Sequence, residues 1–227
     1  MFKPLLKAAT ALGAFCAWTA QATLVHLEGG TVDFYYDNAQ PDMAIYGALA
    51  STGDSIWATP DNFIAEATNG GSASAWGAGT VTVVVKPGYR FSSVAIGLLG
   101  DYGGTSGSSV GVDATFTVEQ SGGSAIDSVT MGGSGGGTFD GLTREWELME
   151  TIDLGTAQWT GVTSLDLSLD TLLTAQASSA GWALIALKGA GAGFIIETVP
   201  VPLPAGIWLF LSGAALLGSR LLKGREA

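Results

Sequence analysis

The sequence predicts an all-β protein, a sandwich of two antiparallel sheets flanked by an N-terminal signal helix and a C-terminal transmembrane helix. Residues 80–85 and 165–170 alternate apolar and polar side chains, which is typical of strands buried on one face. Glycine is abundant, at 34 of 227 residues, and favours tight connections between strands. The only cysteine, Cys16, lies near the N-terminus, so packing must hold the sandwich together without disulfides.

Residues 1–22 have the three parts of a secretory signal peptide. Lys3 and Lys7 form a positive region, and residues 8–18 form an apolar stretch too short to span a membrane. Ala20 and Ala22 are the small residues that a signal peptidase reads. We therefore expect cleavage after Ala22 and export of the remaining chain.

Residues 23–198 are expected to form the β-sandwich, with about ten to twelve strands and a jelly roll as the first expectation for topology. Further strands are predicted at residues 91–99, 113–120, 182–187 and 194–199. In the stretch 91–99, alternation places Phe91 on the same face as Ser93. Residues 144–150 fit either a strand or a short helix.

Two glycine-rich stretches, residues 100–111 and 132–137, are interpreted as surface loops between strands. Aromatic residues beside such loops are candidates for stacking on sugar rings, although most aromatic side chains in a sandwich pack in its core. Trp76 and Tyr102 are the two aromatic residues that we expect to be exposed.

Residues 199–227 combine an apolar run with a basic end. No charge occurs between Glu197 and Arg220. A helix over residues 205–222 would be about 27 Å long, close to the thickness of the hydrocarbon core of a bilayer. Arg220, Lys223 and Arg225 follow, and the positive-inside rule keeps them in the cytoplasm. The central domain would then lie outside the inner membrane.

The residues that precede this predicted helix form a motif, Val201, Pro202, Leu203, Pro204 and Ala205. Motif, apolar helix and basic tail together resemble the PEP-CTERM sorting signal, in its Val-Pro-Leu-Pro-Ala variant. The resemblance implies recognition by an exosortase, a membrane transpeptidase of Gram-negative bacteria that make exopolysaccharide. It also implies cleavage near the motif and delivery of the domain to the cell envelope or matrix. A permanent single-span anchor that is never cut is the alternative.

The charge of the chain is strongly acidic outside its ends. Residues 23–199 hold four basic and nineteen acidic side chains. Such a domain repels phosphate backbones, so we expect no nucleic-acid partner. The expected partners are the signal peptidase, the exosortase, the inner membrane through the C-terminal helix and, in the matrix, exopolysaccharide.

Few residues suggest catalysis. His26 is the only histidine, which excludes a multi-histidine zinc site. Glu145 and Glu147 would share one face of a strand, as a glycosidase pair could, but acidic pairs on an acidic domain are usually solvated. No cofactor is expected. Calcium binding stays open, because four aspartates could supply oxygen ligands although their spacing matches no known motif: Asp33, Asp37, Asp42 and Asp61.

These observations lead to one expected function and one alternative. We expect a non-catalytic surface or extracellular-matrix protein, sorted by an exosortase and associated with exopolysaccharide or biofilm. The alternative is a secreted module that binds or cleaves carbohydrate.

Overall fold

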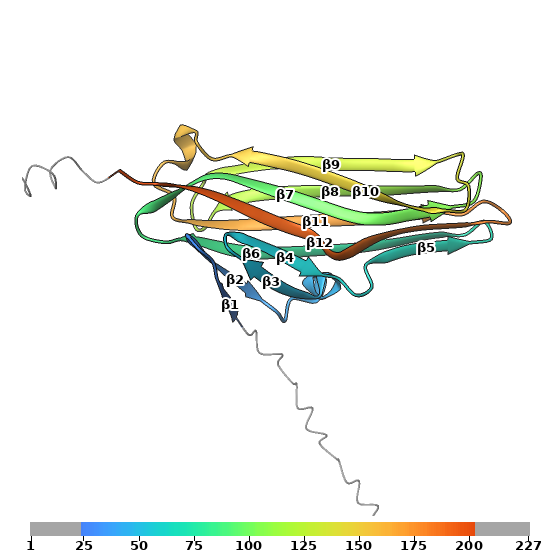
Figure 1. The fold of residues 1–227 in the computed structure, drawn as a ribbon, viewed down its shortest axis with the longest axis horizontal. Coiled ribbons are helices and arrows are strands. Elements are labelled where there is room, and N and C mark those ends of the chain that lie inside the picture. Colours follow the sequence, from blue (N-terminus) through green and yellow to red (C-terminus); the bar gives the residue numbers. More distant parts are fainter. Residues whose placement is uncertain (1–23, 203–227) are drawn as a thin grey trace, which may run out of the picture.

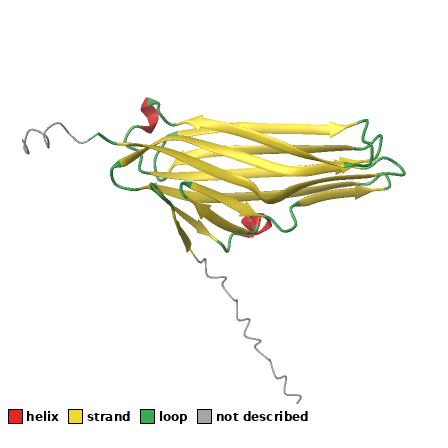
Figure 2. Cartoon of the chain, in the orientation of Figure 1, coloured by secondary structure: helices red, strands yellow, loops and turns green. Residues whose placement is uncertain are grey.

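The computed structural model describes residues 24–202, and these residues form two facing β-sheets (Figures 1 and 2). The all-β, two-sheet antiparallel sandwich is therefore confirmed. Twelve strands and two short 3₁₀ helices follow one another along the chain: β1 (Leu24–Glu28), β2 (Val32–Asp37), η1 (Pro41–Tyr46), β3 (Ala48–Thr52), β4 (Ser55–Thr59), β5 (Ile64–Thr68), β6 (Ser72–Val85), β7 (Tyr89–Gly104), β8 (Ser109–Gln120), β9 (Ile126–Gly136), β10 (Thr143–Asp153), η2 (Ala157–Trp159), β11 (Ser164–Gln176) and β12 (Trp182–Pro200).

Every strand pairs with its neighbours in the antiparallel sense. Sheet A has the order β1-β2-β6-β11-β8-β9, and sheet B has the order β10-β7-β12-β4-β3, with β5 also paired to β12. The chain passes repeatedly from one sheet to the other, as at the β6–β7 and β11–β12 connections. Residues 144–150, for which the sequence left a strand or a short helix open, belong to the edge strand β10.

The core lies between the two sheets, because the long strands bury every second side chain. In β11, every second side chain from Leu165 to Leu173 is buried, whereas those of residues 166, 168, 170 and 172 are at least partly exposed. Phe116 of β8 stacks on Phe194 of β12 across the gap, with ring centroids 5.3 Å apart. Apolar residues at every second position of the sequence are thus the residues that the structure buries.

Most of the two glycine-rich stretches is strand rather than loop, which corrects the expectation for residues 100–111 and 132–137; only the β7–β8 connection at residues 105–108 and Gly137 lie outside strands. They extend β7, β8 and β9 to one end of the sandwich. Glycine is needed there because aromatic rings lie over the backbone. A Cβ atom at Gly100 would lie 2.5 Å from the Trp146 ring, and one at Gly135 would lie 3.0 Å from Tyr102.

Two smaller irregularities also depart from simple alternation. Phe91 is buried rather than on the outer face with Ser93, because the pairing of β7 with β12 shifts between Glu197 and Thr198. The predicted strands 182–187 and 194–199 are one strand, β12, in which the pairing with β7 shifts between Leu187 and Ala192. Before this bulge β12 pairs with β5, and after it with β4.

The predicted signal peptide, including Ala20 and Ala22, lies outside the described residues. So do the predicted transmembrane helix, the basic tail and the last part of the sorting motif, Leu203, Pro204 and Ala205. Between residues 24 and 202, no helix is long and apolar enough to cross a membrane.

A carboxylate ties the two sheets together where the β1–β2 and β3–β4 turns meet. Asp54 accepts hydrogen bonds from the Thr31 N–H and hydroxyl, at 2.7 and 2.6 Å, and from the Val32 N–H at 3.3 Å. The Thr31 hydroxyl also contacts that of Thr198 on β12, at 2.7 Å. Partial burial of Asp54 alone would raise its pKa, but these hydrogen bonds together lower it.

We predict that Asp54→Asn lowers the free energy of unfolding by about 2 kcal/mol at pH 7, because the amide replaces a charged acceptor. Since the folded-state pKa of Asp54 lies below its ordinary value of 3.8, its stabilisation is complete at neutral pH and is lost as pH falls below about 4. Urea unfolding followed by circular dichroism at pH 7 and pH 3 measures both effects.

Asp140→Asn is the matched control, because Asp140 lies on the exposed surface and pairs with Arg144 at 2.8 Å. Its effect on stability should be small at both pH values, because solvent screens an exposed ion pair. A cost for Asp54→Asn equal at the two pH values would contradict the role assigned to the carboxylate.

Candidate functional site

The outer face of sheet A carries one large aromatic side chain that is not packed. Trp76, near the middle of β6, is 50% exposed, whereas Trp159 is buried and the other three described tryptophans are half-buried. The exposure expected for Trp76 is therefore confirmed. That expected for Tyr102 is wrong, because Tyr102 packs against Gly135 and Phe139. An exposed tryptophan is informative, since burial of its large apolar ring would otherwise be favourable.

The strand register shows what surrounds Trp76. Leu172 of β11 is its direct neighbour, and Asp113 of β8 follows on the far side of Leu172. Two residues before Leu172 on β11, Asp170 lies on the same face and pairs with Thr115 of β8. Both aspartates are exposed, and they occupy diagonal positions about 7–8 Å apart. Together with Trp76 they line a shallow hollow of about 330 Å³.

A second, wider hollow adjoins the first on the opposite side of Trp76. It has a volume of about 870 Å³ and crosses four strands, where small hydroxyl-bearing and amide side chains alternate with glycine. We call the two hollows together the Trp76 platform. Its outward-facing residues are Trp76, Leu172, Asp113, Asp170, Thr115, Thr130, Ser72, Ser74, Ser109, Gly111, Ser134, Gly136, Thr174 and Gln176.

The chemistry of this platform suits a ligand with both apolar and hydroxyl-bearing surfaces. The indole ring offers a broad apolar face, while the carboxylates accept hydrogen bonds and the hydroxyls both donate and accept them. On β11 the platform residues are every second residue from Asp170 to Gln176, and they cover about 20 Å along the strand. A chain of several units could therefore contact the platform along its length.

The acidic pair predicted on β10 is arranged differently. Glu145 and Glu147 do share the outer face of sheet B, opposite Asp101 and Leu99 of β7, as predicted. Glu145 is ion-paired with Lys188, which also contacts Asp101 at 3.1 Å, and this lysine lowers the pKa of Glu145. A glycosidase acid needs a raised pKa, so Glu145 does not have the environment of a general acid.

His26, Asp33, Asp37 and Asp61 do not form a metal site in the described part of the chain, and the side chain of Asp42 lies outside that description. His26 lies on β1, where it stacks on Tyr35 with ring centroids 4.8 Å apart and contacts Asp33 at 3.5 Å. Within residues 24–202, no three His, Cys, Asp or Glu residues come close enough together to hold a metal ion.

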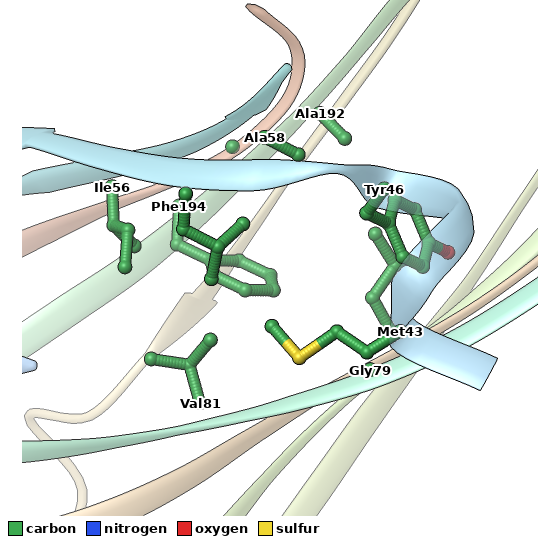
Figure 3. A pocket seen from close by; sticks show the side chains of 11 residues that line it. Met43, Tyr46, Ile56, Ala58, Gly79, Val81, Ala192 and Phe194 are labelled. Atoms are coloured by element: carbon green, nitrogen blue, oxygen red, sulfur yellow. The ribbon is translucent and has the colours of Figure 1, made fainter. Parts of the chain in front are cut away.

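A separate cavity of about 30 Å³ lies between the sheets, beneath η1 (Figure 3). Met43 and Tyr46 of η1 close one side, and Ile56, Val81 and Phe194 line the others. The lining is almost wholly apolar, so this cavity offers no catalytic group and belongs to the core.

The chain matches no family model, and it matches no curated protein. Three solved structures resemble it distantly. TmCBM61 in complex with β-1,4-galactotriose has a TM-score of 0.21 and 10% identity, over 69% of this chain and 92% of that one. Infectious bursal disease virus, Gx strain, has a TM-score of 0.24 and 15% identity, over 72% of this chain and 50% of that one. The enzymatically active domain of bacteriophage CBA120 tailspike protein 4 has a TM-score of 0.25 and 12% identity, over 78% of this chain and 20% of that one.

At these TM-scores the similarities identify neither a shared fold nor a shared ligand. The Trp76 platform must therefore be judged on its own geometry. The sequence singled out Trp76 but not the partners Asp113 and Asp170. Alternation could have placed both on an outer face, since each lies on the polar side of a strand whose other side is apolar, but it could not have placed them near Trp76.

We predict that Val81→Ile stabilises the fold by up to about 1 kcal/mol, because the added methylene enters the cavity beneath η1. Thermal unfolding measures the change. Val83→Ile is the matched control: Val83 is fully buried on the same strand but does not line the cavity. Its added methylene should overpack the core and lower stability by about 1 kcal/mol or more. Equal effects of the two substitutions would contradict this description of the core.

Proposed function

We propose that this chain is an exported, non-catalytic glycan-binding protein of the cell surface or extracellular matrix. The observation that carries the proposal is the exposed Trp76 ring between two hollows lined by hydroxyl, amide and carboxylate groups. A sugar ring has an apolar face of C–H groups and a rim of hydroxyls. The face would stack on the indole, and the hydroxyls would bond to Asp113, Asp170 and the surrounding threonines and serines.

The shape of the platform favours a polysaccharide over a small molecule. Both hollows are shallow and open, whereas sites for small molecules enclose most of their ligand. Affinity for each sugar unit would be modest, and several units would bind along the strands. This suits attachment to a repetitive polymer such as exopolysaccharide. The alternative of glycan cleavage is less well supported, because Lys188 holds Glu145 as an ion pair.

The strand order supports the jelly-roll topology expected from the sequence. The four strands β6-β11-β8-β9 face β10, β7 and β12, and β12 pairs in turn with both β4 and β5. Successive strands after β5 cross between the sheets except at β8–β9. We infer a jelly roll with an added hairpin, β1–β2, at the edge of sheet A.

Export and sorting remain part of the proposal, on the sequence motifs. The first residues of the proposed sorting motif are described, and they support access by a processing enzyme. The Val201 N–H donates to the Gly88 carbonyl at 2.8 Å, and both Val201 and Pro202 are exposed. Pro202 has no N–H and cannot extend the sheet, so the chain leaves the sandwich at the motif.

We predict that Trp76→Ala weakens binding to exopolysaccharide from the producing cells about 30-fold, the loss typical of an aromatic contact residue. Isothermal titration or a pull-down on the insoluble polymer measures it. Tyr89→Ala is the control, because Tyr89 is also exposed, at 38%, but lies at the β6–β7 turn. Equal binding by both variants and the unchanged protein would refute a role for the platform.

We also predict that the mature protein begins at Thr23 and ends within residues 201–205. Intact-mass measurement of the protein from the envelope and from the culture matrix tests both ends. Pro202→Ala should slow release, because the motif would lose its first proline. A C-terminus that remains at Ala227 in both fractions would indicate a permanent anchor.

A further inference from the structure

The outer face of sheet A is acidic as well as aromatic. Its strands β6, β8, β9 and β11 contain no lysine or arginine, whereas β8 and β11 each place two acidic side chains on the outer face. We call these four residues the acidic track: Asp113, Glu119, Asp166 and Asp170. The track begins inside the Trp76 platform and continues along the strands beyond it.

The acids of the track lie side by side across two strands. Asp166 of β11 pairs directly with Glu119 of β8, and Asp170 lies diagonal to Asp113. Like charges in such positions repel each other and cost stability. The two acidic pairs are four residues apart on β11, which is about 13 Å along the strand. This face therefore carries repulsion that a bound cation would relieve.

The basic side chains of residues 24–202 do not neutralise the track. Those that form ion pairs contact other acids: Lys86 contacts Glu28 and Asp33, Arg144 contacts Asp140, and Lys188 contacts Asp101 and Glu145. The Asp166 carboxylate accepts a hydrogen bond from the Thr82 hydroxyl at 2.7 Å, which leaves its charge in place. The track thus presents negative charge to any ligand that lies on the Trp76 platform.

An extended cation fits this arrangement better than a metal ion does. Over the described range, no three His, Cys, Asp or Glu side chains come close enough together to hold a metal ion. Acidic pairs about 13 Å apart instead suit a polymer with repeated positive groups. On a polysaccharide, free amino groups provide that charge. A protonated amine has three N–H donors, and its hydrogen bonds to carboxylates are charge-assisted.

We propose that the polysaccharide bound at the Trp76 platform carries free amino groups, and that the acidic track selects it over neutral and uronate-bearing chains. This inference rests on the proposed glycan binding. One sugar ring stacks on Trp76, and amines of the same chain bond to Asp113 and Asp170. Farther along the strands, amines of later units bond to Asp166 and Glu119. A uronate-bearing chain meets like charge instead.

The test compares four β-1,4-linked hexamers that differ only in charge and substituent. They are the hexamers of glucosamine, N-acetylglucosamine, glucose and glucuronate. Isothermal titration into the full chain in mild detergent should show the glucosamine hexamer binding about tenfold tighter than the two neutral ones, and the glucuronate hexamer binding most weakly. High salt should remove most of the advantage of the glucosamine hexamer, because the carboxylates of the track are solvent-accessible.

Two double variants separate the track from the overall charge of the chain. Asp113→Asn with Asp170→Asn should weaken binding of the glucosamine hexamer about tenfold and change binding of the glucose hexamer little, because asparagine still forms hydrogen bonds. Glu66→Gln with Glu150→Gln is the matched control. It removes the same charge from exposed positions on β5 and β10, away from sheet A, and should leave both affinities unchanged.

The outcomes distinguish this inference from the proposed function beneath it. Binding of the glucose hexamer that depends on Trp76 and matches that of the glucosamine hexamer would overturn the selection but keep the glycan site. No Trp76-dependent binding of any hexamer would overturn both. Hexalysine that binds as tightly as the glucosamine hexamer, in Trp76→Ala as well, would also overturn the selection, because charge alone would then attract the ligand.

Discussion

The structure depends on one constraint, that each long strand buries only one of its two faces. The inner faces of β6, β8, β11 and β12 are apolar and pack together, and residues 24–202 contain no cysteine to crosslink them. Burial of these side chains must therefore provide most of the stability. Because stability comes from the inner faces, the outer faces are left to differ. The face of sheet A carries Trp76 among polar side chains, and that of sheet B exposes Leu99, Met149 and Ile195 beside Glu147.

Some glycines inside the strands leave space for aromatic rings. Trp146 lies over Gly100, and Phe139 lies over Gly104, where a Cβ atom would approach its ring to 2.6 Å. Strands that contain such glycines still pair along their full length. The composition predicted glycine in the connections between strands, and the nine described glycines with a positive φ do lie there. In β7 and β9 glycine serves close packing inside strands rather than turns between them.

Sequence alone predicted the fold class and the approximate number of strands, because alternation records burial directly. It also identified Trp76 as exposed, since the neighbouring residues are small and polar. It could not predict that Asp113 and Asp170 stand near that ring. Their positions follow from the pairing of β11 with both β6 and β8, and non-local pairing is not encoded in any single segment. The burial of Phe91 was missed for a related reason, since a bulge reverses the alternation.

The chain leaves the sandwich at a different place from the two outer faces. Pro200 ends β12 beside Tyr89, at the end of the strands rather than on either face. A processing enzyme that reached Val201 would approach the end of the sandwich without covering Trp76. The proposed binding to a polymer and the proposed cleavage at the motif would therefore be sterically compatible. A protein that is first sorted and then attached to a matrix would need both.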